Sequence, residues 1–363
     1  MGIVTSKERM LVALGGGIPD RLPATIHQWQ DYHLRTFMAG MTDREAFRDV
    51  GLDAAITRSP FVTPETASWS VRVSHPGPGR TRNEIETPDG NLSFETESNE
   101  YTSWISEHLI KNDGDVDLYA AHFPRIGLDR ELLRRDYDAL GDDGILRMFI
   151  IGHQGGCWQD ACELYGTEQL IMASFDKPDW VHHFLAVLLE RKLEFIADHM
   201  KGAAVDLVET GGGASSSTVI SPALHEAFCL PYDRKLHDAL HAVGHRVVYH
   251  TCGGMKAIVP QILRNGCDVS ETLSPPGMGG DIAAEDRAMI KSTLGARLAL
   301  VGGLDQNNIL GRGSRESITA EVENLFSTFG RSGGYVMSAS DHFFDVPREN
   351  LVHYASVARS CTY

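Results

Sequence analysis

The sequence lacks the features that mark a membrane, secreted or nucleic-acid-binding protein. Its 33 Lys and Arg are outnumbered by 49 Asp and Glu, which gives a formal net charge of -16. Such a chain repels phosphate backbones and anionic bilayers, so neither nucleic acid nor a membrane is an expected partner. No segment approaches the roughly 18 apolar residues of a membrane span, and residues 1–10 contain no apolar signal-peptide core. We therefore expect a cytoplasmic protein.

Cysteine is scarce, and several nucleotide-binding and hydrolase motifs are absent. The 6 cysteines are scattered without the spacing of a disulfide framework, which suits a reducing compartment in which thiolate chemistry is available. The chain has no G-x-G-x-x-G fingerprint, no P-loop and no G-x-S-x-G elbow. These absences argue against nicotinamide, nucleoside triphosphate and serine hydrolase chemistry.

Short β-rich runs alternate with amphipathic helical segments along most of the chain. This alternation predicts parallel strands with crossover helices, as in residues 180–201, 222–243 and 316–329. We therefore expect an α/β fold, a (β/α)8 TIM barrel that occupies residues 1–363 as a single domain. The eight expected strands are 22–28, 52–57, 145–152, 205–210, 246–251, 267–272, 297–302 and 334–338.

Residues 68–106 interrupt this alternation. They contain alternating β-prone runs, and Pro88-Asp89-Gly90-Asn91 is a strong hairpin turn. We expect an antiparallel hairpin insertion that decorates the barrel, with the active-site mouth as one position for it.

Polar or titratable side chains follow every expected strand. The carboxyl ends of the strands of such a barrel converge on one mouth, where barrel enzymes place their catalytic groups. Each residue alone is commonplace in a structural role, but the complete set indicates an active site. The strand-end residues are His27, Arg58, His153, Gln154, Glu209, His250, Cys252, Glu271, Asp305, Gln306, Asp341 and His342.

His250 and Cys252 stand two residues apart, at the end of an apolar run and before a glycine-rich turn. Side chains at positions i and i+2 of a strand project from the same face, so an imidazole and a thiolate can bind one zinc ion together. The structural alternative is a core histidine beside an inert buried cysteine.

Several segments together resemble the uroporphyrinogen decarboxylase superfamily: residues 6–14, 19–23, 250–253, 302–305 and 333–336. The resemblance implies a (β/α)8 barrel from one of two branches, metal-free porphyrinogen decarboxylases or zinc-dependent corrinoid methyltransferases. Decarboxylases carry an arginine-rich segment after the first strand, but residues 26–33 here read Ile-His-Gln-Trp-Gln-Asp-Tyr-His. The H-x-C pair matches the zinc motif of the methyltransferases.

The resemblance therefore implies transfer of a methyl group between cobalamin and a small methylated substrate, or a thiol or tetrahydrofolate acceptor. Zn²⁺ would be bound by His250 and Cys252. Coenzyme M enzymes take a further cysteine from the loop after the last strand, but residues 338–344 contain none. His342 is our expected third ligand, with Asp341 as a ligand or supporting partner and Cys361 as an alternative.

The remaining polar strand ends are assigned to proton transfer and substrate binding. Glu209 and Glu271 are expected to transfer protons or supply a fourth ligand, although orienting the ligands is an equal alternative. The chain has no D-x-H-x-x-G cobalamin motif, so a separate corrinoid protein would dock at the mouth. The expected substrate-binding residues are His27, His153, Gln154, Asp305 and Gln306.

Two other functions stay open at this stage. A uroporphyrinogen-type decarboxylase, which is a carboxy-lyase, requires basic side chains at the mouth, and Arg58 is the one arginine among the strand ends. A non-catalytic barrel that binds a corrinoid or porphyrin would need no working zinc site. The oligomeric state, including a homodimer, is also left open.

Overall fold

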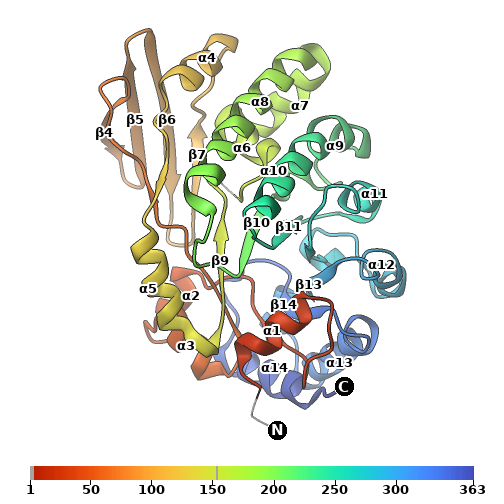
Figure 1. Cartoon of the computed structure of the whole chain (residues 1–363). Helices are drawn as coiled ribbons and strands as arrows, with labels where there is room; N and C mark the ends of the chain where they lie inside the picture. The colour runs from red at the N-terminus through yellow and green to blue at the C-terminus, as the bar shows by residue number, and fades with distance from the viewer. Residues whose placement is uncertain (1–3, 153) are drawn as a thin grey trace.

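Eight parallel strands form one sheet that curls into a nearly closed barrel (Figure 1). The computed structural model describes residues 4–152 and 154–363, and within them it confirms the expected (β/α)8 architecture. Strands β1 and β2 are the two edges of the sheet, and where they meet the Asp53 amide donates to the Ala24 carbonyl over 2.9 Å. The strands are β1 (Ala24–Thr25), β2 (Ala54–Thr57), β9 (Gly144–Phe149), β10 (Leu207–Gly211), β11 (Val247–His250), β12 (Val269–Thr272), β13 (Ala299–Leu304) and β14 (Tyr335–Ala339).

Helices cover the outside of the barrel. The helix expected over residues 222–243 is interrupted at Cys229, next to Pro231, because proline cannot donate a backbone hydrogen bond. No helix in the described ranges is both long and apolar enough to cross a bilayer. The helices are α1 (Ser6–Leu14), α2 (Asp31–Phe37), α3 (Asp43–Val50), α4 (Asp113–His122), α5 (Arg130–Leu140), α6 (Cys157–Tyr165), α7 (Thr167–Asp176), α8 (Pro178–Phe195), α9 (Pro222–Phe228), α10 (Leu230–Ala242), α11 (Val259–Ile262), α12 (Arg287–Thr293), α13 (Arg315–Leu325) and α14 (Arg348–Ser360).

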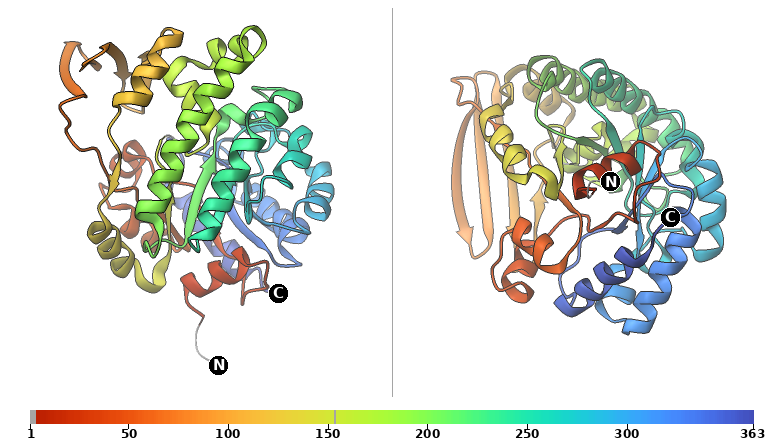
Figure 2. Two further views of the ribbon diagram at one scale, coloured as in Figure 1. Left: turned by 45° about the horizontal axis from the view of Figure 1, so that its top comes forward. Right: turned by 60° about the horizontal axis from the view of Figure 1, so that its bottom comes forward.

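Helix α1 closes the amino-terminal end of the barrel, where it lies across the ring of strands (Figure 2). Met10, Ala13 and Leu14 from this helix are buried against the inward-facing side chains at the beginnings of the strands. Those side chains form an apolar layer, so this end of the barrel interior is a closed core. The functional groups must therefore lie at the opposite end. The layer includes Ala55, Ile145, Leu207, Val248, Val269, Ala299, Val301 and Val336.

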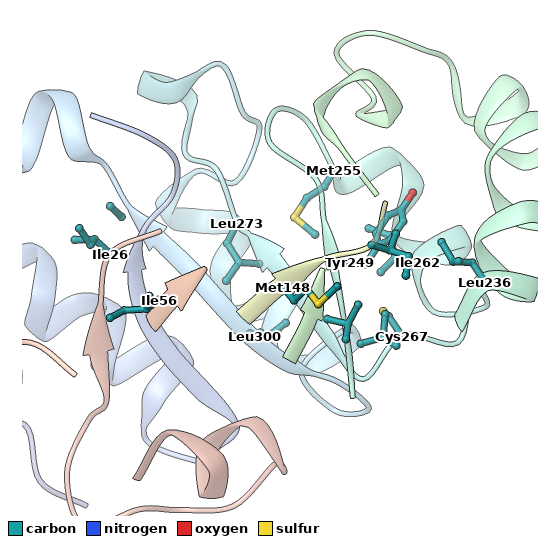
Figure 3. Packing of buried hydrophobic residues seen from close by; sticks show 14 of the residues in the cluster. Ile26, Ile56, Met148, Leu236, Tyr249, Met255, Ile262, Cys267, Leu273 and Leu300 are labelled. Carbon is teal, nitrogen blue, oxygen red and sulfur yellow. The ribbon is translucent and has the colours of Figure 1, made fainter. Parts of the chain in front are cut away.

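The outward faces of the strands form a second, larger core with the helices (Figure 3). Tyr249 of β11 belongs to it, together with Leu236 of α10 and Ile262 of α11. Because successive residues of a strand alternate between faces, Tyr249 points outward while its neighbours Val248 and His250 point into the barrel. This alternation positions the candidate site.

The insertion is a four-stranded antiparallel sheet beside the barrel (Figure 1). The predicted hairpin turn is confirmed, because Thr87 pairs with Gly90 across it. The sheet stands next to α4, α6 and α8, with which it lines a cavity. Its strands are β4 (Ser70–Gly77), β5 (Arg80–Thr87), β6 (Gly90–Ser98) and β7 (Ser103–Glu107), and a separate small pair is β3 (Phe61–Val62) with β8 (Gly127–Leu128).

Candidate functional site

A charged layer lies directly above the apolar layer inside the barrel. On four neighbouring strands, the inward-facing position two residues after the apolar one carries a charged or titratable side chain. The pairs are Ile145 and Arg147, Leu207 and Glu209, Val248 and His250, and Val269 and Glu271. The two-residue period of these strands therefore builds the site.

Arg147 holds the two glutamates together. Its Nη2 atom lies 2.5 Å from Glu209 Oε2 and 2.6 Å from Glu271 Oε1, and each of the three side chains is at most 3% exposed. Buried carboxylates need such a cation, because an uncompensated charge in this environment is costly. Arg147 was not among the site residues predicted from the sequence, although a lone arginine within an apolar strand is a signal of a buried ion pair.

His250 is oriented by Glu271 on the neighbouring strand. Its Nδ1 lies 3.0 Å from Glu271 Oε1 and 3.5 Å from Glu209 Oε1. The other ring nitrogen, Nε2, is buried and has no hydrogen-bond partner among the described residues. A carboxylate on one nitrogen and an unsatisfied second nitrogen is the arrangement of a metal-binding histidine.

The surroundings of His250 attract a cation. Burial by itself would lower its pKa, but the Cys252 sulfur and the carboxylates of Glu271 and Glu209 raise the pKa well above its usual range. Anionic groups that draw a proton to a buried imidazole also draw a divalent metal ion.

The two glutamates have different proton affinities. Burial raises the pKa of Glu209 to about 7, with Glu271 adding to the effect and Arg147 opposing it. Burial also acts to raise the pKa of Glu271, but Arg147 and the hydrogen bond from His250 outweigh it and hold that pKa well below its usual range. Glu271 therefore stays ionised at neutral pH, whereas Glu209 can exchange a proton near neutral pH.

His27 joins two groups of possible metal ligands. Its ring centre lies 4.9 Å from that of His250 and 5.2 Å from that of His342. Donor atoms of His27, Glu209 and His250 lie within 4.8 Å of one another, and so do those of His27, Asp341 and His342. Burial lowers the pKa of His27 well below its usual range, which favours the neutral imidazole that binds metals. We expected this residue to bind substrate, but the structure places it between the candidate ligands.

Cys252 lies beyond the end of β11, in the turn that follows, and its sulfur points toward Gly213. A Cβ atom at Gly213 would lie 2.6 Å from that sulfur, so the approach depends on glycine. Among the described residues, the compact donor groups combine His250 or His342 with His27 and a carboxylate, and neither contains Cys252. The Cys252 sulfur is nevertheless near enough to His250 to raise the pKa of its imidazole, and the expected set of His250, Cys252 and His342 stays a prediction.

The remaining predicted residues have mainly structural contacts. Asp305 Oδ1 caps the turn that follows β13 by accepting from the Asn307 and Asn308 amides, and Gln306 Nε2 donates to the His342 carbonyl over 3.2 Å. Gln154 Oε1 accepts from the Gly213 amide over 3.3 Å.

Three other positions singled out in the sequence are Arg58, Cys361 and His153. Arg58 is paired with Asp43 and Asp136. Cys361 lies at the amino-terminal end of the barrel, where its carbonyl accepts from the Leu22 amide. His153 lies outside the described residues.

These features define an α/β barrel with a buried carboxylate and histidine cluster at the carboxyl ends of its strands. The chain belongs to the uroporphyrinogen decarboxylase (URO-D) family, whose model matches residues 123–360. A uroporphyrinogen decarboxylase from Myxococcus xanthus (strain DK1622) is 23% identical over 234 residues, which cover 62% of this chain and 61% of that protein.

The fold is shared with a solved structure. A methyltransferase from Methanosarcina mazei superposes with a TM-score of 0.68 at 17% identity, covering 99% of both chains. A B12-independent methionine synthase from Shewanella sp. W3-18-1 gives a TM-score of 0.44 at 10% identity over 95% of both chains. At 17% identity, the likeness to the Methanosarcina mazei protein concerns the fold alone.

Proposed function

We propose that the protein is a zinc-dependent methyltransferase that moves a methyl group between a corrinoid and a small methylated molecule, thiol or tetrahydrofolate. The observation behind this proposal is His250, whose Nδ1 is held by Glu271 while its buried Nε2 has no hydrogen-bond partner in the described structure. The motif that His250 shares with Cys252 and the methyltransferase structure with the same fold support it.

The donor groups fit a zinc ion. Glu209 Oε1 and Glu271 Oε2, like His250 Nε2, are buried without a hydrogen-bond partner among the described residues. His250, Glu209 and His27 would hold the ion, with Cys252 at the adjacent turn as the thiolate ligand. Imidazole, carboxylate and thiolate are the usual ligands of Zn²⁺. A bound zinc ion would act as a Lewis acid on the heteroatom that gains or loses the methyl group.

The protein groups have separate roles in this proposal. Arg147 fixes both carboxylates, and Glu271 fixes the imidazole of His250 in one orientation. Glu209 has two alternative roles. As a zinc ligand it would release its proton to the solvent when the ion binds. Where Cys252 takes that ligand position instead, the pKa of about 7 would let Glu209 remove a proton from an attacking thiol or supply one to a departing oxygen or nitrogen. The corrinoid would come from a partner protein, because the chain has no motif of its own to bind it.

Decarboxylation of a porphyrin-like acid is the second candidate, because the relative from Myxococcus xanthus is a uroporphyrinogen decarboxylase. That reaction needs cationic side chains that are available to substrate carboxylates. Arg147 is paired with Glu209 and Glu271, and Arg58 with Asp43 and Asp136, so neither of these arginines meets that requirement. This pairing favours the methyltransferase.

Two measurements test the proposal. Elemental analysis of protein purified in thiol-free buffer should find one zinc ion per chain. Cob(I)alamin with methyl ethers, methylamines or methyl thioethers, or methylcobalamin with thiols or tetrahydrofolate, should then show the spectral change between the two cobalamin forms. If neither cobalamin assay shows a spectral change and uroporphyrinogen yields coproporphyrinogen, the protein is a decarboxylase. Corrinoid or porphyrin binding without turnover would identify a non-catalytic barrel.

A further inference from the structure

A cavity of about 710 Å³ lies between the inserted sheet and the helices beside it. One wall comes from β4 to β7, and the other from α4, α6 and α8 together with adjoining segments. Protein interiors contain few voids larger than a water molecule, so a space of this size is not a packing defect. Small-molecule sites typically measure about 300–1,000 Å³.

The inserted sheet has two different faces. One face carries an array of ion pairs, such as Arg72 with Glu84 at 2.9 Å and Arg82 with Glu107 at 2.8 Å. These pairs satisfy one another and suit a face in contact with water. The opposite face supplies Val71, Ile85, Phe94, Thr96 and Ile105 to the cavity.

Aromatic side chains form much of the remaining lining. Trp69 packs edge-on against Tyr119 and Phe123, with ring centres 6.2 and 5.2 Å away, and Tyr119 stacks on Phe123 at 4.6 Å. Trp104 on β7 borders the cavity, but it is 44% exposed and pairs across the strands with Glu97, so its side chain belongs to the charged face of the sheet. Rigid aromatic walls favour a flat apolar ligand.

The charged groups at the cavity disfavour an anionic ligand. Asp160 lines it and is neutralised by Lys192, whose Nζ lies 2.5 Å from Asp160 Oδ2. Glu163 also lines the cavity, and its Oε1 accepts from Gln159 Nε2 over 3.2 Å. An anionic group placed beside Asp160 and Glu163 would be repelled by their carboxylates. Asn83, Thr96 and Ser103 offer polar atoms to an uncharged ligand.

We infer that this cavity is a second binding site, distinct from the His250 cluster, for an uncharged small molecule that contains an aromatic ring. The lining residues in the described structure come from the insertion, the neighbouring helices with their adjoining segments, and Gly152 after β9, and they do not include the His250 cluster. The concave shape, with walls on both sides, suits a small molecule better than a second protein surface.

Two fluorescent probes with the same aromatic body test this inference on the full-length protein. N-phenyl-1-naphthylamine is uncharged, and 8-anilino-1-naphthalenesulfonate adds one negative charge. The uncharged probe should bind saturably with one site per chain and quench the fluorescence of Trp69. The anionic probe should bind at least about tenfold more weakly, because its charge meets the two carboxylates.

Variants locate the site. Thr96→Phe fills the cavity and should weaken binding of N-phenyl-1-naphthylamine at least about tenfold. Thr102→Phe adds the same ring at an exposed turn outside the lining and should leave binding unchanged. His250→Ala should also leave it unchanged, which separates this site from the mouth and from the proposed methyl transfer.

Three outcomes would overturn the inference. These are no saturable binding, equal binding of the two probes, or equal binding by wild type and Thr96→Phe. If Thr96→Phe does not fold, as judged by circular dichroism, Ser103→Phe at the exposed rim of the cavity replaces it, and unchanged probe binding by that variant would equally overturn the inference. A stable dimer that covers the sheet and excludes the probe would assign this face to a second copy of the chain.

Discussion

His250 and Glu271 are partners across the neighbouring strands β11 and β12, with Nδ1 of the imidazole 3.0 Å from Oε1 of the carboxylate. The pairing determines which way the ring faces and leaves Nε2 available to a ligand. Both side chains are buried, so the orientation is protected from water.

Glu271→Gln should therefore weaken zinc binding without abolishing it. The amide keeps the shape of the side chain but loses the charge that orients His250 and increases its basicity. We expect an affinity loss of about 10- to 100-fold, as is typical for an outer partner of a metal ligand. Competition with a chromogenic chelator measures it. An unchanged affinity would mean that Glu271 does not support the metal.

Removing a direct ligand should have a larger effect. His250→Ala and Cys252→Ser are expected to lose zinc and methyl-transfer activity while the circular dichroism spectrum is retained, because alanine and serine are poor replacements for these ligands. If Cys252→Ser keeps a full complement of zinc and Glu209→Gln does not, the ion is held by the cluster of His27, Glu209 and His250 without the thiolate.

Variants at His27 and His342 test which of the two groups of possible zinc ligands holds the ion. His27→Ala should remove zinc in either arrangement, because His27 belongs to both groups. His342→Ala should remove it only if the ion is held by His27, Asp341 and His342. X-ray absorption at the zinc edge counts the imidazole ligands in each variant. Full zinc occupancy in His27→Ala would exclude both groups.

Arg147→Met should destabilise the protein strongly. It leaves Glu209 and Glu271 buried without their cation, and breaking a buried pair in this way costs about 3–5 kcal/mol. Arg58→Met is the matched control, since Arg58 is partly exposed and its ion pairs contribute about 1 kcal/mol or less. Urea unfolding of metal-free protein gives both values. If both variants lost the same free energy of unfolding, burial of the ion pair would not determine the loss.

Asp233 should make stability depend on pH. Burial raises its pKa to about 7, despite the opposing effects of Tyr249 and Lys192, and Oδ2 has no hydrogen-bond partner within the described residues. The folded protein therefore keeps a proton that the unfolded chain releases above about pH 4. The free energy of unfolding should fall as pH rises from about 4 to about 7, by an amount on the order of 4 kcal/mol.

Asp233→Asn cannot titrate and should remove this part of the pH dependence. Urea unfolding of both proteins at pH 4.5 and pH 7.5 gives the comparison. The difference in stability between variant and wild type should change between the two pH values. A constant difference would show that Asp233 has an ordinary pKa.

The sequence predicted the barrel because both of its signals are local. Apolar β-prone runs alternate with helical segments, and all eight expected strands are present in the described structure, most of them shorter than expected. It also placed Glu209, His250 and Glu271 at strand ends facing the mouth, because a two-residue period determines which side chains share a face.

Contacts between distant strands could not be read from these local patterns. His27 precedes His250 by more than two hundred residues, and they meet because closure of the barrel brings β1 and β11 to the same mouth. In the sequence, Arg147 is a single polar residue within an apolar strand. In the structure, it pairs with Glu209 from β10 and Glu271 from β12.

The sequence by itself determined the strands, their inward faces and the supply of imidazole, thiol and carboxylate groups at the mouth. The tertiary structure decided which of these groups meet. His27 illustrates the reason: its ring lies 4.9 Å from that of His250, although β1 and β11 are far apart in the sequence. Strand periodicity is a property of consecutive residues, whereas a ligand cluster depends on barrel closure and turn geometry, which involve the whole chain.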